Sequence, residues 1–391
     1  MNLNRRNLLK QLGAGIAASS LLAPRRASAH SSESILDSKT PPQLPEPIRL
    51  DRNENAYGAS QKAVAAIQET AIGTSHYPDS NVLLKNLADH HREAALGGNQ
   101  VIKPEQIVVG CGSSDVLRMA ASAFLTPGTT LIMAVPTCDL IAKYGRSRGA
   151  TVIEVPLRND HAHDLDGMLK YSNKSGAGGL IYVCNPNSPT GTLTTRKDLE
   201  EFLGKVSPQF QVVIDEAYHH YAGGSGAYVS FIDRPSDNSR VIVTRTFSTA
   251  YGLAGARVGY AVASSSAAEK MAREGLPFAL NRAGMFAASA ALADREHIES
   301  CTNRNFNDRQ EFLNQVNARM LRALDSHGNF VCLNVMRPAT EISAHYIKNN
   351  VVLAPVIPAM PNYLRVSLGT SQEMREFWRV WDLLGSHQMS M

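Results

Sequence analysis

The chain has 391 residues, of which 43% are hydrophobic and 19% charged, and its formal net charge is +4 at pH 7. This composition supports one large domain or two smaller ones with a sizeable core, and it argues against intrinsic disorder. Residues 1–29 hold five Lys or Arg and no acid, so the remainder carries 34 basic residues against 35 acidic ones, a balance unlike that of a nucleic-acid-binding surface. No uncharged apolar run beyond position 30 reaches the roughly 18 residues of a membrane span.

Residues 1–29 contain three features of an export signal in order. Residues 4–10, Asn-Arg-Arg-Asn-Leu-Leu-Lys, resemble a twin-arginine signal, an apolar stretch follows at 12–23, and Ala-Ser-Ala at 27–29 offers a cleavage site. The alternative is an ordinary basic amphipathic N-terminus. We expect a twin-arginine signal peptide over 1–29, and therefore a periplasmic or exported protein, followed by an N-terminal arm over 30–75.

Short apolar runs rich in β-branched residues alternate with helical spacing, as at 114–124 and 197–206. The candidate strands are 107–109, 131–135, 152–155, 180–183, 212–214, 241–244 and 258–262. This alternation predicts an α/β fold in three layers, in which helices cover both faces of a mainly parallel seven-stranded sheet. We place this large domain at 76–285.

The last hundred residues have a different pattern. Helical spacing extends from about 285 to 330, and candidate strands follow at 329–335 and 363–368. We expect a smaller α+β domain over 286–391.

Polar motifs follow several strands, and parallel α/β sheets bind ligands at the carboxyl ends of their strands. The first motif is Gly-Cys-Gly-Ser-Ser-Asp at 110–115, which follows a strand and opens a helix. Its small residues let backbone N–H groups approach a phosphate, and the helix N-terminus favours the negative charge. A plain serine helix cap is the alternative.

Three later motifs also end strands. Asn-Pro-Asn-Ser-Pro-Thr-Gly at 185–191 would by itself be a proline-stiffened turn. Asp215 follows an apolar strand, where a carboxylate is costly unless it meets a cation such as a protonated pyridine nitrogen; a helix-capping role is the alternative. Residues 246–260 combine several glycines with Arg257, whose planar guanidinium suits a phosphate.

In this order, over about residues 48–385, the four motifs resemble those of the fold-type I, pyridoxal-phosphate-dependent class I/II aminotransferases, in particular the histidinol-phosphate aminotransferases. The resemblance implies pyridoxal 5′-phosphate as cofactor, and an amino acid and a keto acid as substrates. It also implies a homodimer, because Tyr77 matches the tyrosine that reaches the neighbouring subunit's cofactor. The residues implied to hold the cofactor phosphate are Ser113, Ser114, Ser248 and Arg257.

The resemblance implies further roles. Asp215 would pair with the pyridinium nitrogen and keep the ring an electron sink. Tyr218 and Asn187 would lie at the ring oxygen. Tyr57 belongs to a segment that lines the substrate site, and Arg365 would clamp the substrate carboxylate with two parallel hydrogen bonds.

The sequence also departs from the family pattern. Thr249 occupies the position of the lysine that forms the Schiff base and moves the proton, and loss of a positioned base alone costs typically ~10²–10⁴-fold. Cys138 stands where an aromatic residue stacks on the ring, and Ser188 replaces an asparagine. Residues 352–355 lack the Gly-Arg pair that relatives often carry.

The sequence therefore predicts an exported aminotransferase for an amino acid or related amine, with Asp215, Tyr218 and the Thr249 position at its catalytic centre and no metal site. Two alternatives stay open. One is a catalytically impaired or non-catalytic relative that binds the cofactor or a ligand without a covalent bond. The other is a partner-binding protein that keeps only the fold, and the presence of Asp215, Tyr218 and Arg257 argues against it.

Overall fold

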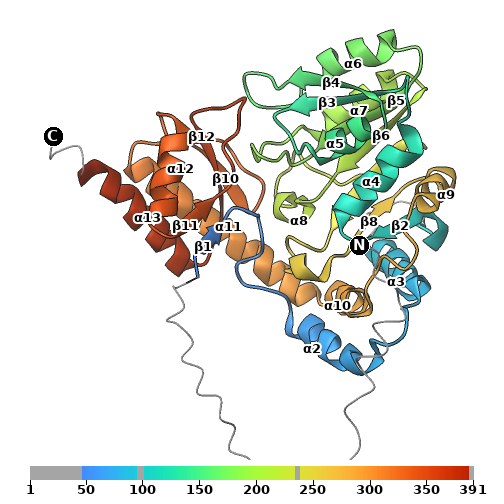
Figure 1. Cartoon of the computed structure of the whole chain (residues 1–391), viewed down its shortest axis with the longest axis horizontal. Coiled ribbons are helices and arrows are strands. Elements are labelled where there is room, and N and C mark those ends of the chain that lie inside the picture. The colour runs from blue at the N-terminus through green and yellow to red at the C-terminus, as the bar shows by residue number, and fades with distance from the viewer. Residues whose placement is uncertain (1–45, 95–100, 234–237, 387–391) are drawn as a thin grey trace, which may run out of the picture. The chain divides into compact units, whose positions relative to one another are not determined.

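The computed structural model describes residues 46–94, 101–233 and 238–386 (Figure 1). From residue 46 onward the described chain forms one compact unit. The predicted signal at 1–29 and the first part of the predicted arm lie outside the described residues. No helix in the described part of the chain combines the length and apolarity that a membrane crossing requires.

A seven-stranded sheet in the order β2-β8-β7-β6-β5-β3-β4 forms the centre. β8 runs antiparallel to both of its neighbours, and the other neighbouring pairs are parallel. Each strand falls within two residues of its predicted position, so the predicted α/β class is confirmed. The strands are β2 (Ile107–Gly110), β3 (Thr130–Val135), β4 (Thr151–Pro156), β5 (Gly179–Cys184), β6 (Phe210–Asp215), β7 (Val241–Thr246) and β8 (Gly259–Val262).

Alternate side chains of the central strands feed two separate cores, which makes three layers. On β5, Leu180 and Tyr182 belong to one core, whereas Ile181 and Val183 belong to the other. The first core is covered by α4 (Ser113–Phe124), α5 (Leu140–Ser147) and α9 (Ser265–Arg273). The second is covered by α2 (Gln61–Thr70), α3 (Ser80–Ala94), α6 (Leu165–Lys174), α7 (Arg196–Lys205) and α10 (Arg282–Leu292).

The C-terminal part contains the two strands predicted there, which pair antiparallel within a small sheet of order β12-β10-β9. A parallel pair between β1 (Ile48–Leu50) and β11 (Val351–Leu353) places the start of the described chain against this part (Figure 1). The remaining α-helices and strands are α8 (His219–Ala222), α11 (Arg295–Ala318), β9 (Arg322–Ala323), β10 (Phe330–Asn334), α12 (Ala339–Lys348), β12 (Tyr363–Ser367) and α13 (Ser371–Ser386). The domain boundaries at 75 and 285 stay predictions.

Candidate functional site

The carboxyl ends of β3, β5, β6 and β7 meet at a cavity of about 750 Å³, the place at which parallel sheets bind ligands. Residues that follow these strands line it, together with the start of α4 and one residue of β12. Eight of the predicted site residues lie here: Ser113, Ser114, Asp215, Tyr218, Ser248, Thr249, Arg257 and Arg365.

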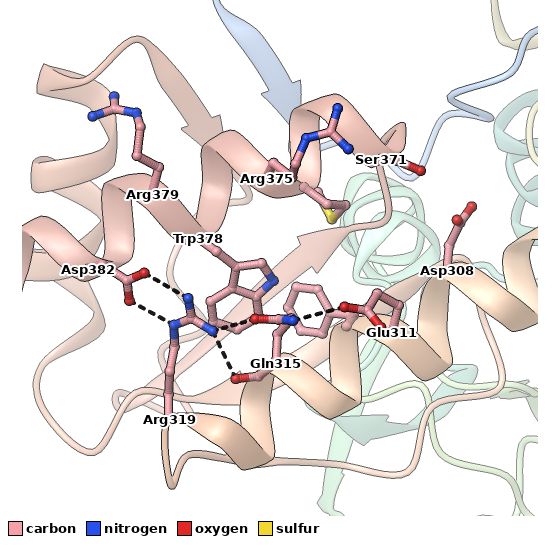
Figure 2. A pocket seen from close by; sticks show the side chains of 11 residues that line it. Asp308, Glu311, Gln315, Arg319, Ser371, Arg375, Trp378, Arg379 and Asp382 are labelled. Carbon is pink, nitrogen blue, oxygen red and sulfur yellow. Dashed lines mark hydrogen bonds and ion pairs between the residues drawn. The ribbon is translucent and has the colours of Figure 1, made fainter.

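A second cavity, of about 630 Å³, lies between α11 and α13 (Figure 2). Its apolar floor includes Phe312 and Trp378, and no predicted site residue lines it. The Arg319 guanidinium is held by the Asp382 carboxylate at 2.7 Å and by Gln315, as Figure 2 shows. This cation is therefore already paired within the protein.

One end of the first cavity is built to hold an anion. α4 begins directly after Gly112, and no side chain of the described residues caps its N-terminus, so the first N–H groups point out of the helix. The Arg257 guanidinium donates to the Ser114 hydroxyl at 3.2 Å and to the carbonyl oxygens of Cys111 and Ala254. All three acceptors are neutral, so the positive charge of Arg257 is available to a ligand.

The backbone at this end is shaped for close approach. Arg257 has φ +55°, a left-handed conformation that costs a non-glycine residue on the order of 1 kcal/mol. A Cβ on Gly112 would lie 2.3 Å from the Arg257 guanidinium, and one on Gly259 would lie 2.2 Å from the Ser113 nitrogen. Both glycines are therefore required for the arginine and the helix N-terminus to come together.

Asp215, the last residue of β6, is only 4% exposed. Its carboxylate accepts hydrogen bonds from the Tyr182 hydroxyl at 2.8 Å and the Ala217 N–H at 3.1 Å, and no described cation pairs with it. Burial raises the pKa of this carboxyl group. An anion held in this way would be stabilised by a ligand that brings a proton or a positive charge.

Tyr218 and Arg365 lie on the side of the cavity formed with the C-terminal part. The Tyr218 hydroxyl accepts from the Asn53 amide at 2.9 Å, and burial raises the pKa of Tyr218 to about 12. Arg365 donates to the Ser188 hydroxyl at 3.3 Å and the Asp51 carbonyl at 2.5 Å, whereas its Nε is buried without a partner. This guanidinium also meets no carboxylate within the described chain.

Thr249 lies 7% exposed in the turn after β7. Its hydroxyl donates to the Ala217 carbonyl at 2.8 Å. The residues described around this cavity include no lysine that could replace it. Cys138, at the predicted stacking position, also lines the cavity, and burial raises the pKa of its thiol.

Three predicted site residues lie away from the cavity lining. Asn187 is fully buried, and its amide is occupied by Thr137, Thr190 and the Pro136 carbonyl. The Tyr57 hydroxyl donates to Asp308 at 2.9 Å. Tyr77 is 72% exposed and stacks on Phe278 with ring centroids 4.1 Å apart, so its role toward a neighbouring subunit stays a prediction.

Sequence reasoning missed Tyr182. It lies within an apolar strand, and its hydroxyl is the side-chain hydrogen-bond donor to Asp215. The available signal was weak: a single tyrosine in a fully buried strand, two residues before the strand's carboxyl end, on the face that Cys184 shares. Only the register between β5 and β6, in which Cys184 lies opposite Asp215, brings the hydroxyl to the carboxylate.

Neighbouring buried carboxylates should respond oppositely to neutralisation. Asp215→Asn should raise the free energy of unfolding of the cofactor-free protein by about 1 kcal/mol, because an uncompensated buried charge is removed. The amide oxygen can still accept from the Ala217 N–H, and the Tyr182 hydroxyl can rotate to accept from the new amide NH2. Glu216→Gln is the matched control: Glu216 pairs with buried Arg245 at 3.1 Å, so its loss should cost about 3–5 kcal/mol. Urea unfolding at neutral pH measures both. Equal destabilisation of the two variants would contradict this view of Asp215.

Comparison with known proteins agrees with this geometry. The sequence model of the aminotransferase class I and II family matches residues 45–380. The histidinol-phosphate aminotransferase of Methylobacillus flagellatus is 38% identical over 335 residues, which cover 85% of this chain and 87% of that protein. The corresponding protein of Caldicellulosiruptor saccharolyticus is 35% identical over 331 residues, covering 84% and 89%.

A solved structure of a related protein has the same fold. The Sinorhizobium meliloti histidinol-phosphate aminotransferase in complex with pyridoxal-5′-phosphate superimposes with a TM-score of 0.77 at 26% identity, covering 85% of this chain and 88% of that one. The resemblance inferred from the motifs is therefore confirmed at the level of the family. This chain belongs to the class I and II aminotransferases, the pyridoxal-phosphate-dependent transaminases.

Proposed function

We propose that this chain is an exported aminotransferase that acts on an amino acid or a related amine. The observation that carries the proposal is the meeting, in one cavity, of an anion site at Arg257 and α4 with the unpaired buried carboxylate of Asp215. A phosphorylated pyridine matches both features: its phosphate fits the anion site, and its ring nitrogen can carry a proton toward the Asp215 carboxylate.

The residues present fit pyridoxal phosphate at both ends. Ser113, Ser114, Ser248 and Arg257 would hold its phosphate, and Asp215 would hold the proton on its ring nitrogen. The cofactor supplies an electron sink for removal of the proton on the carbon next to the substrate amine. Tyr218, whose hydroxyl stays protonated at neutral pH, can donate a hydrogen bond to a ring oxygen.

Thr249 determines that the cofactor would be bound without a covalent bond to the protein. A threonine hydroxyl provides no amine for a covalent bond, and this one already donates to the Ala217 carbonyl. The cofactor would therefore be held by its phosphate and ring contacts alone. The same observation favours a second candidate function, namely binding of the cofactor or an amine adduct of it with little or no turnover.

The homodimer implied by the family resemblance also remains a proposal. It is supported by exposed Tyr77 and Phe278, which stack on each other at the surface.

Replacement of Thr249 by lysine should restore the missing anchor. The native sequence should bind pyridoxal phosphate and lose it on desalting, and borohydride treatment should leave no covalent adduct. Thr249→Lys should retain the cofactor as a borohydride-fixed adduct, detected by mass spectrometry, and should transaminate at least about 10²-fold faster. Thr249→Met, a side chain of similar length without an amine, is the matched control.

The outcomes separate the candidates. Slow but measurable transamination by the native chain supports the enzyme, whereas binding without turnover supports the second function. If neither the native chain nor Thr249→Lys binds the cofactor, both proposals are wrong.

Export can be tested with the two arginine pairs of the predicted signal peptide, Arg5–Arg6 and Arg25–Arg26. Substitution of Arg5 and Arg6 by lysine should retain the protein in the cytoplasm, because the twin-arginine route reads this pair. The same change at Arg25 and Arg26 preserves charge equally and should leave export intact. Cell fractionation followed by immunoblotting measures both, and export that survives the first double substitution would contradict the proposed route.

A further inference from the structure

The charges that line the cavity limit the anions that it can accept. Among the described residues there, the cationic side chains are Arg52, Arg257 and Arg365. The Arg52 side chain is 64% exposed, so water screens its charge, and its nearest carboxylate, Asp51, lies 3.7 Å away and pairs more closely with Arg49 at 2.6 Å. Arg257 and Arg365 contact only neutral acceptors. The proposed function assigns Arg257 to the cofactor phosphate, which leaves Arg365 as the part-buried cation of the cavity that no described carboxylate compensates.

The second cation, Arg365, lies beside an apolar wall. This wall is the segment 355–359, Pro-Val-Ile-Pro-Ala, which connects β11 to β12 and lines the cavity. Within it, Ile357 packs against Cys332, and Cys332 lies directly opposite Arg365 in the β10–β12 register. Arg365 and the apolar wall thus occupy the same end of the cavity.

The side chains of the apolar wall cannot bind a second anion. None of its five side chains carries a charge or a hydrogen-bond donor, and its two prolines lack a backbone N–H. A carboxylate or phosphate placed against these side chains would lose water without gaining a side-chain partner, which is unfavourable. An aliphatic or aromatic side chain would instead bury apolar surface there.

We propose that the substrate is an amino acid whose only anionic group is its α-carboxylate and whose side chain is apolar, selected by Arg365 together with the apolar wall at 355–359. This inference rests on the proposed function. One guanidinium matches one carboxylate. Beside the apolar wall, a dicarboxylic amino acid would bring a second, unpaired carboxylate, and a phosphate monoester such as histidinol phosphate would bring a dianion to one part-buried cation. The chain would then differ in substrate from the relatives named for histidinol phosphate.

The substrate assignment can be tested without turnover, by binding of stable adducts in which the cofactor is reductively linked to each amine. Cofactor-free protein is titrated calorimetrically with the phosphopyridoxyl adducts of L-leucine, L-aspartate, histidinol phosphate and 3-methylbutylamine, which is leucine without its carboxylate. All four share the pyridine half, so differences in Kd report only the substrate half. The leucine adduct should bind at least about tenfold tighter than each of the others.

A variant locates the preference in the apolar wall. Val356→Arg places a cation there and should reverse the order of the leucine and aspartate adducts, whereas the matched Val356→Leu should keep it. Binding of pyridoxamine phosphate by each variant verifies that the fold and the cofactor end are intact.

The results distinguish this inference from the proposed function. Tightest binding of the aspartate or histidinol-phosphate adduct, or equal binding of all four adducts, overturns the substrate assignment while the cofactor site stands. Failure of both the adducts and pyridoxamine phosphate to bind overturns the proposed function as well.

Discussion

The site depends on a buried carboxylate, that of Asp215, with which no cation of the described residues pairs. Asp215 is 4% exposed at the end of β6, and its hydrogen bonds come from a tyrosine hydroxyl and a backbone N–H. The next residue, Glu216, is equally buried but pairs with Arg245. The two adjacent carboxylates therefore have different roles: Glu216 contributes to stability, and Asp215 is assigned to ligand binding. The charge of Glu216 is compensated within the fold, and that of Asp215 is left for a ligand.

The rest of the cavity supplies what such a ligand needs. Arg257, forced into a left-handed backbone conformation, and the open N-terminus of α4 meet its anionic group. Two glycines make this approach possible because any Cβ would collide with the arginine or with the helix backbone. Arg365 and the apolar wall at 355–359 line the cavity from the C-terminal part, where we propose that the substrate binds. Thr249 lacks the amine of the covalent anchor, whereas Asp215 and Arg257, the groups assigned to the ring nitrogen and the phosphate, line the cavity.

Much of this was predictable from the sequence because the informative residues are local. Buried parallel strands such as 180–183 are continuous apolar runs, and the residues that end them are adjacent in sequence to the strands that position them. Asp215 and Arg257 could therefore be placed at one edge of the sheet. Tyr182 could not, since its contact depends on the register between β5 and β6.

The β1–β11 pair could not be predicted either, because it joins strands of three residues, which are too short to show a period. The expected place of Asn187 at the ring oxygen stays a prediction, and its amide contacts to Pro136, Thr137 and Thr190 are ones that local sequence does not encode.

The central claim is that Asp215 keeps the ring nitrogen of the bound cofactor protonated. The direct measurement is the ¹⁵N chemical shift of ring-labelled pyridoxamine phosphate bound to the native chain and to Asp215→Asn, across the pH range in which the protein stays folded. The account predicts a protonated ring nitrogen throughout in the native chain and loss of that proton near neutral pH in the variant. An unprotonated ring nitrogen in the native chain, or identical shifts in the two proteins, would contradict it.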